Sequence, residues 1–595
     1  MWPSLITVMG SVKKVWYKDE TLQSKIKYYP YIANPKHYER WVEKRRLTCG
    51  HIGRMKRISK RLSYRPKVSL MVFLQAWKKS RLEKALTSVK YQIYQNWELC
   101  VVVDGPIEAD LQLVIQQITK HDDRIRIHHL SDKASLVEVA TTALGLASGE
   151  FVGFFRPDDQ LSANALFEVG LVLNQKKSTD FIYSDEDSLT ASGQRIFPFF
   201  KPDWSPDTLR SYNYVGDLAV IRKSVLERAG GLTDADMYTG NYELFLKLEE
   251  MALRIVHIPK VLYHRFHQEG STPDIRNESH PVNSRAKKAL ASHIRRKGWN
   301  AVVNDGLFPG SYRVKFQISS SPHVVIIIPN RDKVEILQSC IKSILLKSSY
   351  RSYSVLIVDN RSTMPETHSY YEEVISHSNI SLLSYDKRFN YSRMINYAVR
   401  KTASEYFILL NNDTEIISPD WIESMLEFAQ RKEVGAVGAL LYYPDNRVQH
   451  GGVLLGVAGV AGHSHRHFPK ESVGYHGRLK VIQNLSAVTG ACLMTGRSVF
   501  HEVGGMDEGL SHAYNDVDFC LRLREHNYLI VYTPYAELYH NEASTRGRED
   551  TLKKKIRYIK EKLYFQWKWR RELASGDPYY NLNLSLKKED FSLRT

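Results

Sequence analysis

Cysteine and long apolar runs are both scarce in this chain of 595 residues. The cysteines are scattered and include no C-x-x-C pair, which argues against a disulfide framework or a zinc site and favours a reducing compartment. No stretch of about 18 apolar residues is present, so we expect no membrane-spanning helix. The apolar run near the start has no basic residues before it, so we expect no signal peptide. These absences predict a cytoplasmic protein. The five cysteines are Cys49, Cys100, Cys340, Cys492 and Cys520.

Acidic residues are also in deficit, with 65 Asp and Glu against 83 Lys and Arg, and the excess of +18 is uneven. Residues 1–65 carry most of it, and a second basic cluster occupies residues 553–562. Such clusters suit anionic lipid, nucleic acid or phosphorylated substrates, whereas the plain alternative is a solvated helix face. Because no nucleic-acid-binding module pattern is present, we expect no nucleic-acid partner. We expect the N-terminal segment to contact anionic membrane lipid peripherally.

The body of the chain alternates strands and helices twice over, which predicts an α/β protein with mostly parallel sheets. Asp359 and Asp413 lie 255 positions after Asp104 and Asp158, and each of these acids follows an apolar run. A repeat this long indicates two similar domains rather than a solenoid. We therefore predict a basic helical segment at 1–66, domains at 67–310 and 322–548, and a basic helix and tail at 549–595. The link between the domains is expected at 310–322, and an insertion of the second copy near 448–477.

The stretch FILLNNDTEII, residues 407–417, is an apolar strand that ends in Asn411, Asn412 and Asp413. Open α/β sheets bind ligands at the carboxyl ends of their strands, and an oxygen ligand beside a nucleotide suits Mg²⁺ or Mn²⁺. The alternative is that Asp413 only forms a turn or caps a helix. The strand ends at Pro329-Asn330 and Asp359 have short polar groups that can bind a base or ribose.

Two later residues complete the candidate site. Asp516 begins a helix-like segment and is a candidate general base for a substrate hydroxyl, although N-terminal helix capping would also explain it. His540 follows a strand-like run and can ligate a divalent metal, although a lone histidine is more often structural.

Several motifs of the second copy resemble those of inverting, nucleotide-sugar-dependent glycosyltransferases of family 2, which have the GT-A fold. The resemblance extends over most of the chain, and DPYYNLNLSL (577–586) resembles the tail of a bacterial subgroup with two tandem domains. That subgroup is associated with O-antigen and related surface-polysaccharide assembly, often as rhamnosyltransferases. The motifs are VDNRS (358–362), FNYSRMIN (389–396), LLNNDTEIISPDW (409–421), QHGGVLLG (449–456), SAVTGACL (486–493), VGGMDE (503–508), YNDVDFCLRLRE (514–525) and TPYAELYHNEASTRG (533–547).

The resemblance implies roles at matching positions. Asp516 corresponds to the catalytic base and Asp413 to the metal-binding Asp of a D-x-D region, whose first place is held by Asn411. His540 corresponds to a histidine near the diphosphate and the metal. The remaining matches imply a nucleotide-sugar site. It is formed by Pro329, Asn330, Asp359, Asn396, Asn411 and Asn412, with Asp359 at the nucleobase.

The first copy resembles the same family but differs where the chemistry would occur. Arg156 stands where the D-x-D-D motif begins, and Asn241 stands where relatives have the base. We therefore expect this copy to bind glycan or nucleotide, or to brace the second copy. Asp158, Asp159 and the acidic run 185–187 leave metal binding by this copy open. For the histidine-rich loop 463–467 we expect no metal site. The resemblance implies that this loop shapes the acceptor side, and its glycines predict a mobile lid over the donor.

The implied activity is the transfer of a hexose or deoxyhexose from a nucleotide-diphosphate sugar to a growing surface glycan. The acceptor is expected to be linked to polyprenyl diphosphate, at the inner face of the cytoplasmic membrane, and the cofactor to be Mg²⁺ or Mn²⁺. Three alternatives stay open: a non-catalytic glycan- or nucleotide-binding scaffold, a nucleic-acid binder, and a polymerising transferase. Intact Asp413 and Asp516 favour an enzyme.

Overall fold

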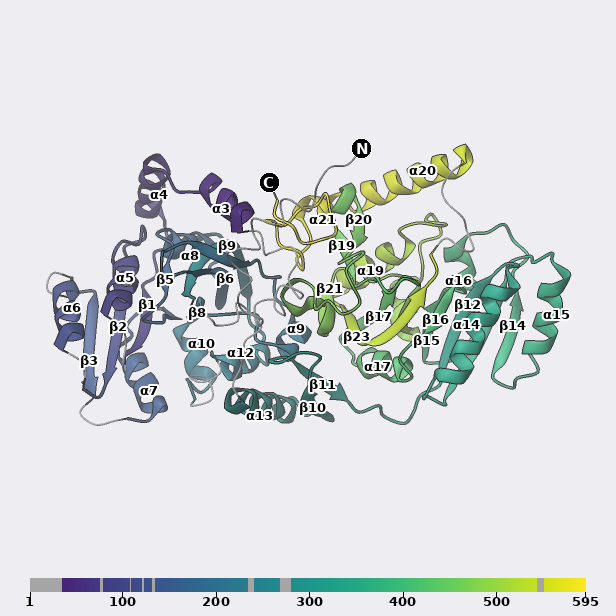
Figure 1. Ribbon diagram of the computed structural model, residues 1–595, viewed down its shortest axis with the longest axis horizontal. Coiled ribbons are helices and arrows are strands. Elements are labelled where there is room, and N and C mark those ends of the chain that lie inside the picture. Colours follow the sequence, from purple (N-terminus) through teal and green to yellow (C-terminus); the bar gives the residue numbers. More distant parts are fainter. Residues whose placement is uncertain are drawn as a thin grey trace, which may run out of the picture.

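The computed structural model describes residues 35–74, 79–106, 109–119, 122–130, 134–233, 240–267, 280–542 and 551–594. The first 34 residues, which hold part of the predicted basic segment, lie outside this range. Two helices, α3 (Pro35–Lys44) and α4 (Cys49–Arg61), precede two sheet domains that lie side by side along the longest axis (Figure 1). The predicted fold class, two tandem α/β domains with helical extensions, is confirmed.

The first domain is built on a sheet with strand order β3-β2-β1-β4-β8-β6-β9-β5. Its first strands pair in parallel, and β1 consists almost entirely of buried apolar residues, as expected for a strand covered on both faces. The strands are β1 (Val68–Leu74), β2 (Trp97–Asp104), β3 (Ile125–Leu130), β4 (Phe151–Phe154), β5 (Gln160–Leu161), β6 (Phe181–Leu189), β7 (Arg195–Phe199), β8 (Ala219–Arg222) and β9 (Ile255–Phe266). The helices include α5 (Lys79–Lys90), α6 (Ala109–Thr119), α7 (Leu136–Leu146), α8 (Ala165–Gln175), α9 (Pro206–Ser211), α10 (Lys223–Arg228), α12 (Tyr242–Glu249) and α13 (His280–Arg296).

The second domain repeats this topology strand for strand, in the order β14-β13-β12-β15-β22-β17-β23-β16. The strands are β12 (Val324–Asn330), β13 (Tyr353–Asp359), β14 (Ile380–Ser384), β15 (Tyr406–Leu410), β16 (Thr414–Ile416), β17 (Val434–Tyr442), β18 (Val448–His450), β21 (Gln483–Leu485), β22 (Cys492–Gly496) and β23 (Leu529–His540). The helices include α14 (Val334–Lys347), α15 (Pro365–Val374), α16 (Tyr391–Lys401), α17 (Trp421–Ala429), α18 (Arg497–Glu502) and α19 (Asn515–Glu525). The hairpin β19 (Val453–Leu455) and β20 (Ala461–His463) lies within the predicted insertion.

Strand register corrects one part of the predicted repeat. Thr414 of β16 faces His540 of β23, and Gln160 of β5 faces His264 of β9. The residues that directly precede the two short strands are therefore equivalent. Asp413 of the second domain thus corresponds to Asp159 of the first, and not to Asp158. Phe154 of β4 and Leu409 of β15 are equivalent in register, and the first domain has one residue more between that position and the short strand, so a constant sequence offset fails here.

The predicted link at 310–322 contains a buried strand. The hairpin of β10 (Ala301–Asp305) and β11 (Tyr312–Phe316) packs between the domains, where Arg313 Nη2 lies 2.8 Å from Glu427 Oε1 of α17. The chain therefore passes between the domains as part of a shared core and not as a free linker.

The C-terminal region returns to both domains. Helices α20 (Leu552–Lys568) and α21 (Arg570–Ser575) lie against the second domain (Figure 1), and the tail then reaches the first. There the Asn581 side chain donates to Asp185 Oδ1 at 3.0 Å, and the backbone N–H of Asp203 donates to the Pro578 carbonyl at 2.7 Å. Within the part of the chain that the structure describes, every helix is too short or too polar to cross a membrane.

Candidate active site

The loop between β15 and β16 places an acid and an amide at one corner of the second sheet, beside an imidazole at the end of β23. Pairing of β16 with β23 sets His540 beside Asp413, so that His540 Nε2 lies 3.2 Å from Asp413 Oδ1. The amide of Asn411 lies 3.2 Å from the same ring nitrogen. Asp413 and His540 are both buried, at 4% and 6% exposure.

This donor set fits a divalent cation in part. A carboxylate oxygen, an imidazole nitrogen and an amide are ligand types that Mn²⁺ and Mg²⁺ accept. Among the described residues no group of three or more His, Cys, Asp or Glu side chains is arranged to hold a metal. An ion at Asp413 and His540 would therefore need oxygen atoms from a second molecule to complete its coordination.

Asp516 lies in the first turn of α19, and its backbone surroundings orient its carboxylate. Its Oδ2 accepts a hydrogen bond from the Gly490 N–H at 2.8 Å, and its Oδ1 accepts one from the Val517 N–H at 2.8 Å. The capping position belongs to Tyr514, whose positive φ of 62° turns the chain into the helix and whose side chain makes no capping bond. Asp516 is therefore not the N-cap residue of α19, although its Oδ1 binds an N–H group of the first turn, and its side chain is half-buried at a cavity wall.

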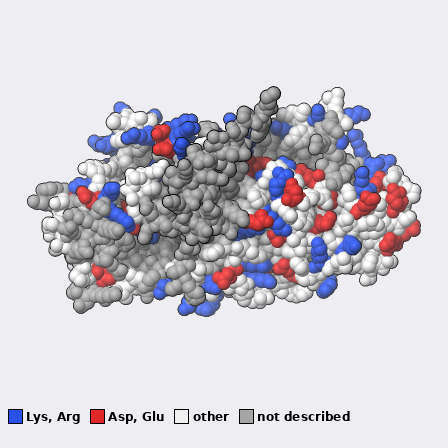
Figure 2. All heavy atoms as spheres, viewed as in Figure 1, with Lys and Arg blue, Asp and Glu red and all other residues white. Residues whose placement is uncertain are grey.

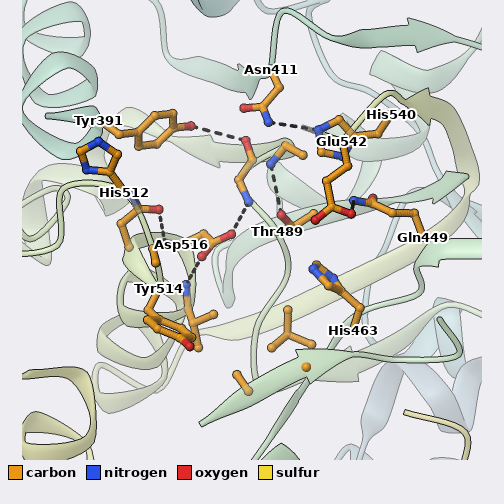
Figure 3. Close-up of a pocket in the computed structure, with 18 of the residues that line it drawn as sticks. Tyr391, Asn411, Gln449, His463, Thr489, His512, Tyr514, Asp516, His540 and Glu542 are labelled. Atoms are coloured by element: carbon orange, nitrogen blue, oxygen red, sulfur yellow. Dashed lines mark hydrogen bonds between the residues drawn. The ribbon is translucent and has the colours of Figure 1, made fainter. Parts of the chain in front are cut away.

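A cavity of about 460 Å³ brings these groups together (Figure 3). Asn411, Asp413 and His540 line one part of it, and Asp516 lines another. Its walls also include residues that were not predicted, among them Tyr391, Gln449, His463, Thr489 and Glu542. The structure thus joins the predicted metal-binding residues and the predicted base in one space.

A smaller cavity of about 260 Å³ adjoins the first, since Tyr391, Asn411 and His512 line both. Four of the predicted nucleotide-sugar residues line it: Pro329, Asn330, Asn411 and Asn412. Asn412 Nδ2 donates to Asn330 Oδ1 at 2.6 Å, which ties the end of β15 to the end of β12.

Two predicted nucleotide-sugar residues line neither cavity. The carboxylate of Asp359 accepts hydrogen bonds from the Tyr371 hydroxyl at 3.0 Å and from the Ser362 N–H at 3.2 Å, and it therefore holds the turn after β13. Asn396 exchanges hydrogen bonds with the backbone of Met506, at 2.9 and 2.8 Å. Its amide thus holds α16 to the loop before α19. Both residues shape the site from behind its walls.

The residues that sequence reasoning missed come from two sources. Tyr391 and Met394 belong to the motif FNYSRMIN and lie one helical turn apart, on the face of α16 that meets the smaller cavity. That spacing was a usable signal. Lys554 and Arg557 line the smaller cavity and Tyr558 lines the larger one, although all three belong to α20. Nothing local in the sequence connects α20 with strand ends some 140 to 230 residues earlier.

The histidine-rich loop forms part of the wall of the larger cavity. His463 Nδ1 lies 2.8 Å from His450 Nδ1, and burial lowers the pKa of both rings. His465 has a structural role, because its Nε2 accepts the Tyr475 N–H at 2.9 Å and its ring stacks on Phe591 at 4.2 Å. The loop is packed against the C-terminal tail in this structure, and the predicted mobile lid over the donor stays a prediction.

The equivalent corner of the first domain is filled by a guanidinium. Arg156 Nε lies 3.7 Å from both Asp158 Oδ1 and Asp159 Oδ2. Asp159 also accepts hydrogen bonds from the Tyr263 hydroxyl at 2.8 Å and the Phe266 N–H at 2.7 Å, while burial raises its pKa to about 7. His264 turns instead toward Asp187, at 2.5 Å. A fixed positive charge therefore stands where the second domain offers Asp413 and His540.

Comparison with known proteins agrees with this architecture. Residues 322–560 match the model described as glycosyltransferase like family 2, and residues 70–230 match glycosyl transferase family 2. Both halves of the chain belong to glycosyltransferase family 2. The chain is thus a tandem family 2 glycosyltransferase with two GT-A domains.

Three relatives of this tandem glycosyltransferase are informative. The uncharacterized protein y4gI of Sinorhizobium fredii is 36% identical over 93% of the chain and 61% of its own length. The O-antigen biosynthesis protein RfbC of Myxococcus xanthus is 34% identical over 90% of the chain, which spans 41% of RfbC. The N-acetylglucosaminyl-diphospho-decaprenol L-rhamnosyltransferase of Mycobacterium tuberculosis (strain H37Rv) is 28% identical over 33% of the chain and 70% of that enzyme.

Proposed function

We propose that the second domain transfers a hexose or deoxyhexose, with rhamnose as one candidate, from a nucleotide-diphosphate sugar to a growing surface glycan. The observation that carries the proposal is the shared cavity of Asp516, Asp413 and His540. A cation corner and an oriented carboxylate within one cavity are what a displacement at a sugar carbon requires.

The two cavities suggest how the donor is divided between them. The smaller one, with Asn330, Asn412, Lys554 and Arg557, has the polar and basic lining that suits a nucleoside and its phosphates. The larger one holds Asp413 and Asp516, and it would contain the sugar and the acceptor hydroxyl. Asn411 and Tyr391 lie at the junction, where the diphosphate would pass.

The chemistry assigned to Asp516 is general-base catalysis. Its carboxylate removes the proton of the acceptor hydroxyl as that oxygen bonds to the anomeric carbon, and the bond from that carbon to the diphosphate oxygen breaks. The nucleotide diphosphate leaves on the opposite face, so the configuration inverts. Asp413 and His540 would hold Mg²⁺ or Mn²⁺, which when bound neutralises negative charge on the leaving diphosphate. The Gly490 and Val517 N–H groups keep the carboxylate of Asp516 aimed into the cavity.

The acceptor is the less direct part of the proposal. Relatives named for transfer to diphospho-decaprenol and PP-undecaprenol substrates favour a glycan carried on polyprenyl diphosphate. Such an acceptor would place the enzyme at the inner, cytoplasmic face of a membrane. Because the chain spans only part of the length of its two longest matches, the activity of a complete relative is not carried over to it.

The first domain is proposed to brace the second and to contribute no transfer of its own, since Arg156 fills its cation corner. A scaffold that binds glycan or nucleotide without catalysis is the second candidate function. The polar smaller cavity would serve that role equally well.

The proposal is tested with a panel of nucleotide sugars. The release of nucleotide diphosphate is measured for each donor with and without Mn²⁺. We expect one donor to be turned over and Mn²⁺ or Mg²⁺ to accelerate it. The variant Asp413→Asn should lose most of the metal-dependent rate, roughly 10²-fold, because one charged ligand is removed. If the wild type binds donors in the presence of acceptor but turns none of them over, the non-catalytic scaffold is supported instead.

A further inference from the structure

Helix α20 presents an apolar stripe to the outside of the molecule. Most amphipathic helices turn their apolar face toward the core. In α20 the large apolar side chains of one face are instead exposed, at fractions from 45% to 74%. The stripe consists of Leu552, Ile556, Ile559, Leu563 and Trp567, which follow one another at intervals of three or four residues.

Lysines border this stripe on both sides. At about 100° per residue, Lys553 and Lys560 lie along one edge of it and Lys555 and Lys562 along the other. Lys553, Lys555 and Lys560 are exposed. Lys and Arg atoms are visible along the upper right edge of the molecule, where α20 lies in the ribbon view (Figure 2).

The opposite face of α20 is fixed to the catalytic domain. Glu561 is buried and accepts hydrogen bonds from the Ser511 and Ala513 N–H groups at 3.0 and 2.8 Å. Phe565 is fully buried. Just beyond the helix, Trp569 Nε1 donates to Asp518 Oδ1 at 2.9 Å. These contacts hold the helix against the domain. The apolar stripe is therefore exposed although the helix is packed on its other face.

We propose that α20 lies flat on an anionic lipid bilayer, with the stripe of Leu552, Ile556, Ile559, Leu563 and Trp567 inserted at the boundary of headgroups and acyl chains. A row of apolar residues between two rows of lysines is the pattern that binds such a surface, because the lysines meet anionic headgroups. An exposed Trp at the end of the stripe suits the same interface. A protein partner fits less well, since interface cores are depleted of lysine.

The position of α20 connects this surface to the catalytic domain. Tyr558 lines the larger cavity, and Lys554 and Arg557 line the smaller one, so the same helix forms part of the rim of both. A bilayer bound by the outer face of α20 would bring a lipid-linked acceptor to that rim. This functional consequence rests on the proposed function, whereas binding to the bilayer does not.

Flotation of the full chain with vesicles tests the proposal. The wild type should bind vesicles that contain phosphatidylglycerol more tightly than vesicles of phosphatidylcholine alone, and salt should weaken the binding. The double variant Ile559→Glu, Leu563→Glu should bind at least about tenfold more weakly, because two charges replace inserted apolar side chains. The control Leu346→Glu changes a leucine of the same domain that is more exposed than Ile559 and Leu563, and it should bind like the wild type.

A second readout places Trp567 in the lipid. Brominated acyl chains should quench the fluorescence of Trp567. The contribution of Trp567 is the difference in fluorescence between the wild type and Trp567→Phe. Wild-type binding to vesicles by the double variant, or the absence of binding by the wild type, would overturn the proposal. So would a wild-type dimer that the double variant converts to a monomer, since a second copy would then cover the stripe.

Transfer assays separate this inference from the proposed function. The double variant should transfer sugar to a water-soluble acceptor within about twofold of the wild type and lose rate only with a lipid-linked acceptor in vesicles. If neither protein transfers sugar to any acceptor, the proposed function fails while the vesicle result still decides the role of α20. Equal loss of rate by the double variant on both acceptors would contradict a membrane role.

Discussion

Asp207 is a buried acid of the first domain that is held by side chains of the second, and its removal tests how the domains are joined. Its Oδ1 lies 2.6 Å from Arg431 Nη1 and 2.9 Å from Arg210 Nη1, and its Oδ2 accepts a hydrogen bond from Asn484 at 2.7 Å. Arg431 and Asn484 belong to the second domain. The carboxylate is 2% exposed, so water does not screen these contacts.

The magnitude follows from the pKa of Asp207. Burial opposes ionisation, but Arg431, Arg210 and Asn484 outweigh it and lower the pKa to about 2. Against an unfolded value of about 3.9, this corresponds to about 2.5 kcal/mol of stability. Because the folded pKa is the lower one, the contribution is fully present above about pH 5 and is lost progressively as pH falls through the folded pKa of about 2. At pH 3 about half of it should remain.

Urea unfolding of the wild type and of Asp207→Asn at pH 7 and pH 3 measures this. At pH 7 the variant should be less stable by at least about 2.5 kcal/mol, because Arg431 and Arg210 lose a charged partner in a buried place. The difference should shrink by about half at pH 3. The control Asp386→Asn, at an exposed position, should stay within about 0.5 kcal/mol of the wild type at both pH values. A difference that is unchanged or larger at pH 3 would refute the reasoning.

Two further predictions concern Asn396 and Arg156. Asn396→Ala should lower the free energy of unfolding by about 1 to 3 kcal/mol, because the backbone groups of Met506 lose their hydrogen-bond partners. The donor KM should stay within about twofold of the wild type. A tenfold rise in KM would show that Asn396 contacts the donor. Arg156→Gln should leave sugar transfer within about twofold of the wild type, because the first domain is assigned no transfer step. A loss of transfer without a loss of stability would show that the first domain takes part.

The placement of most of the predicted strand-end residues was predictable because it depends on local pattern. Apolar runs that end in polar residues identified Asn330, Asn411, Asn412 and Asp413, and all four line the two cavities. Parallel strands carry such ends to the same edge of a sheet, whatever the details of packing. The tandem fold was predictable for the same reason, since the pattern occurs twice.

Side-chain direction was less predictable. Asn396 follows Tyr391 and Met394 in one motif, but it points away from the smaller cavity to the backbone of Met506. The pairing of Asp413 with Asp159 depended on one extra residue in a loop, which only strand register reveals.

Long-range packing could not be predicted. The stretch at 310–322 has a composition typical of a link, yet β11 is buried because β10 and the second domain cover it. The basic residues 553–562 were recognised as a cluster. Some of these residues line the smaller cavity and others border the apolar stripe. Which residues do which depends on the face of α20 that contacts the catalytic domain, and that face is set by Glu561 and Phe565.

The most direct test of the central claim is the rate of sugar transfer by Asp516→Asn with the donor that the panel identifies. The amide keeps the shape of the side chain but cannot accept the acceptor proton, so kcat should fall by about 10² to 10⁴-fold while donor binding stays within about threefold. Asp386→Asn should transfer at the wild-type rate. Wild-type turnover by Asp516→Asn would contradict the assignment of Asp516 as the base.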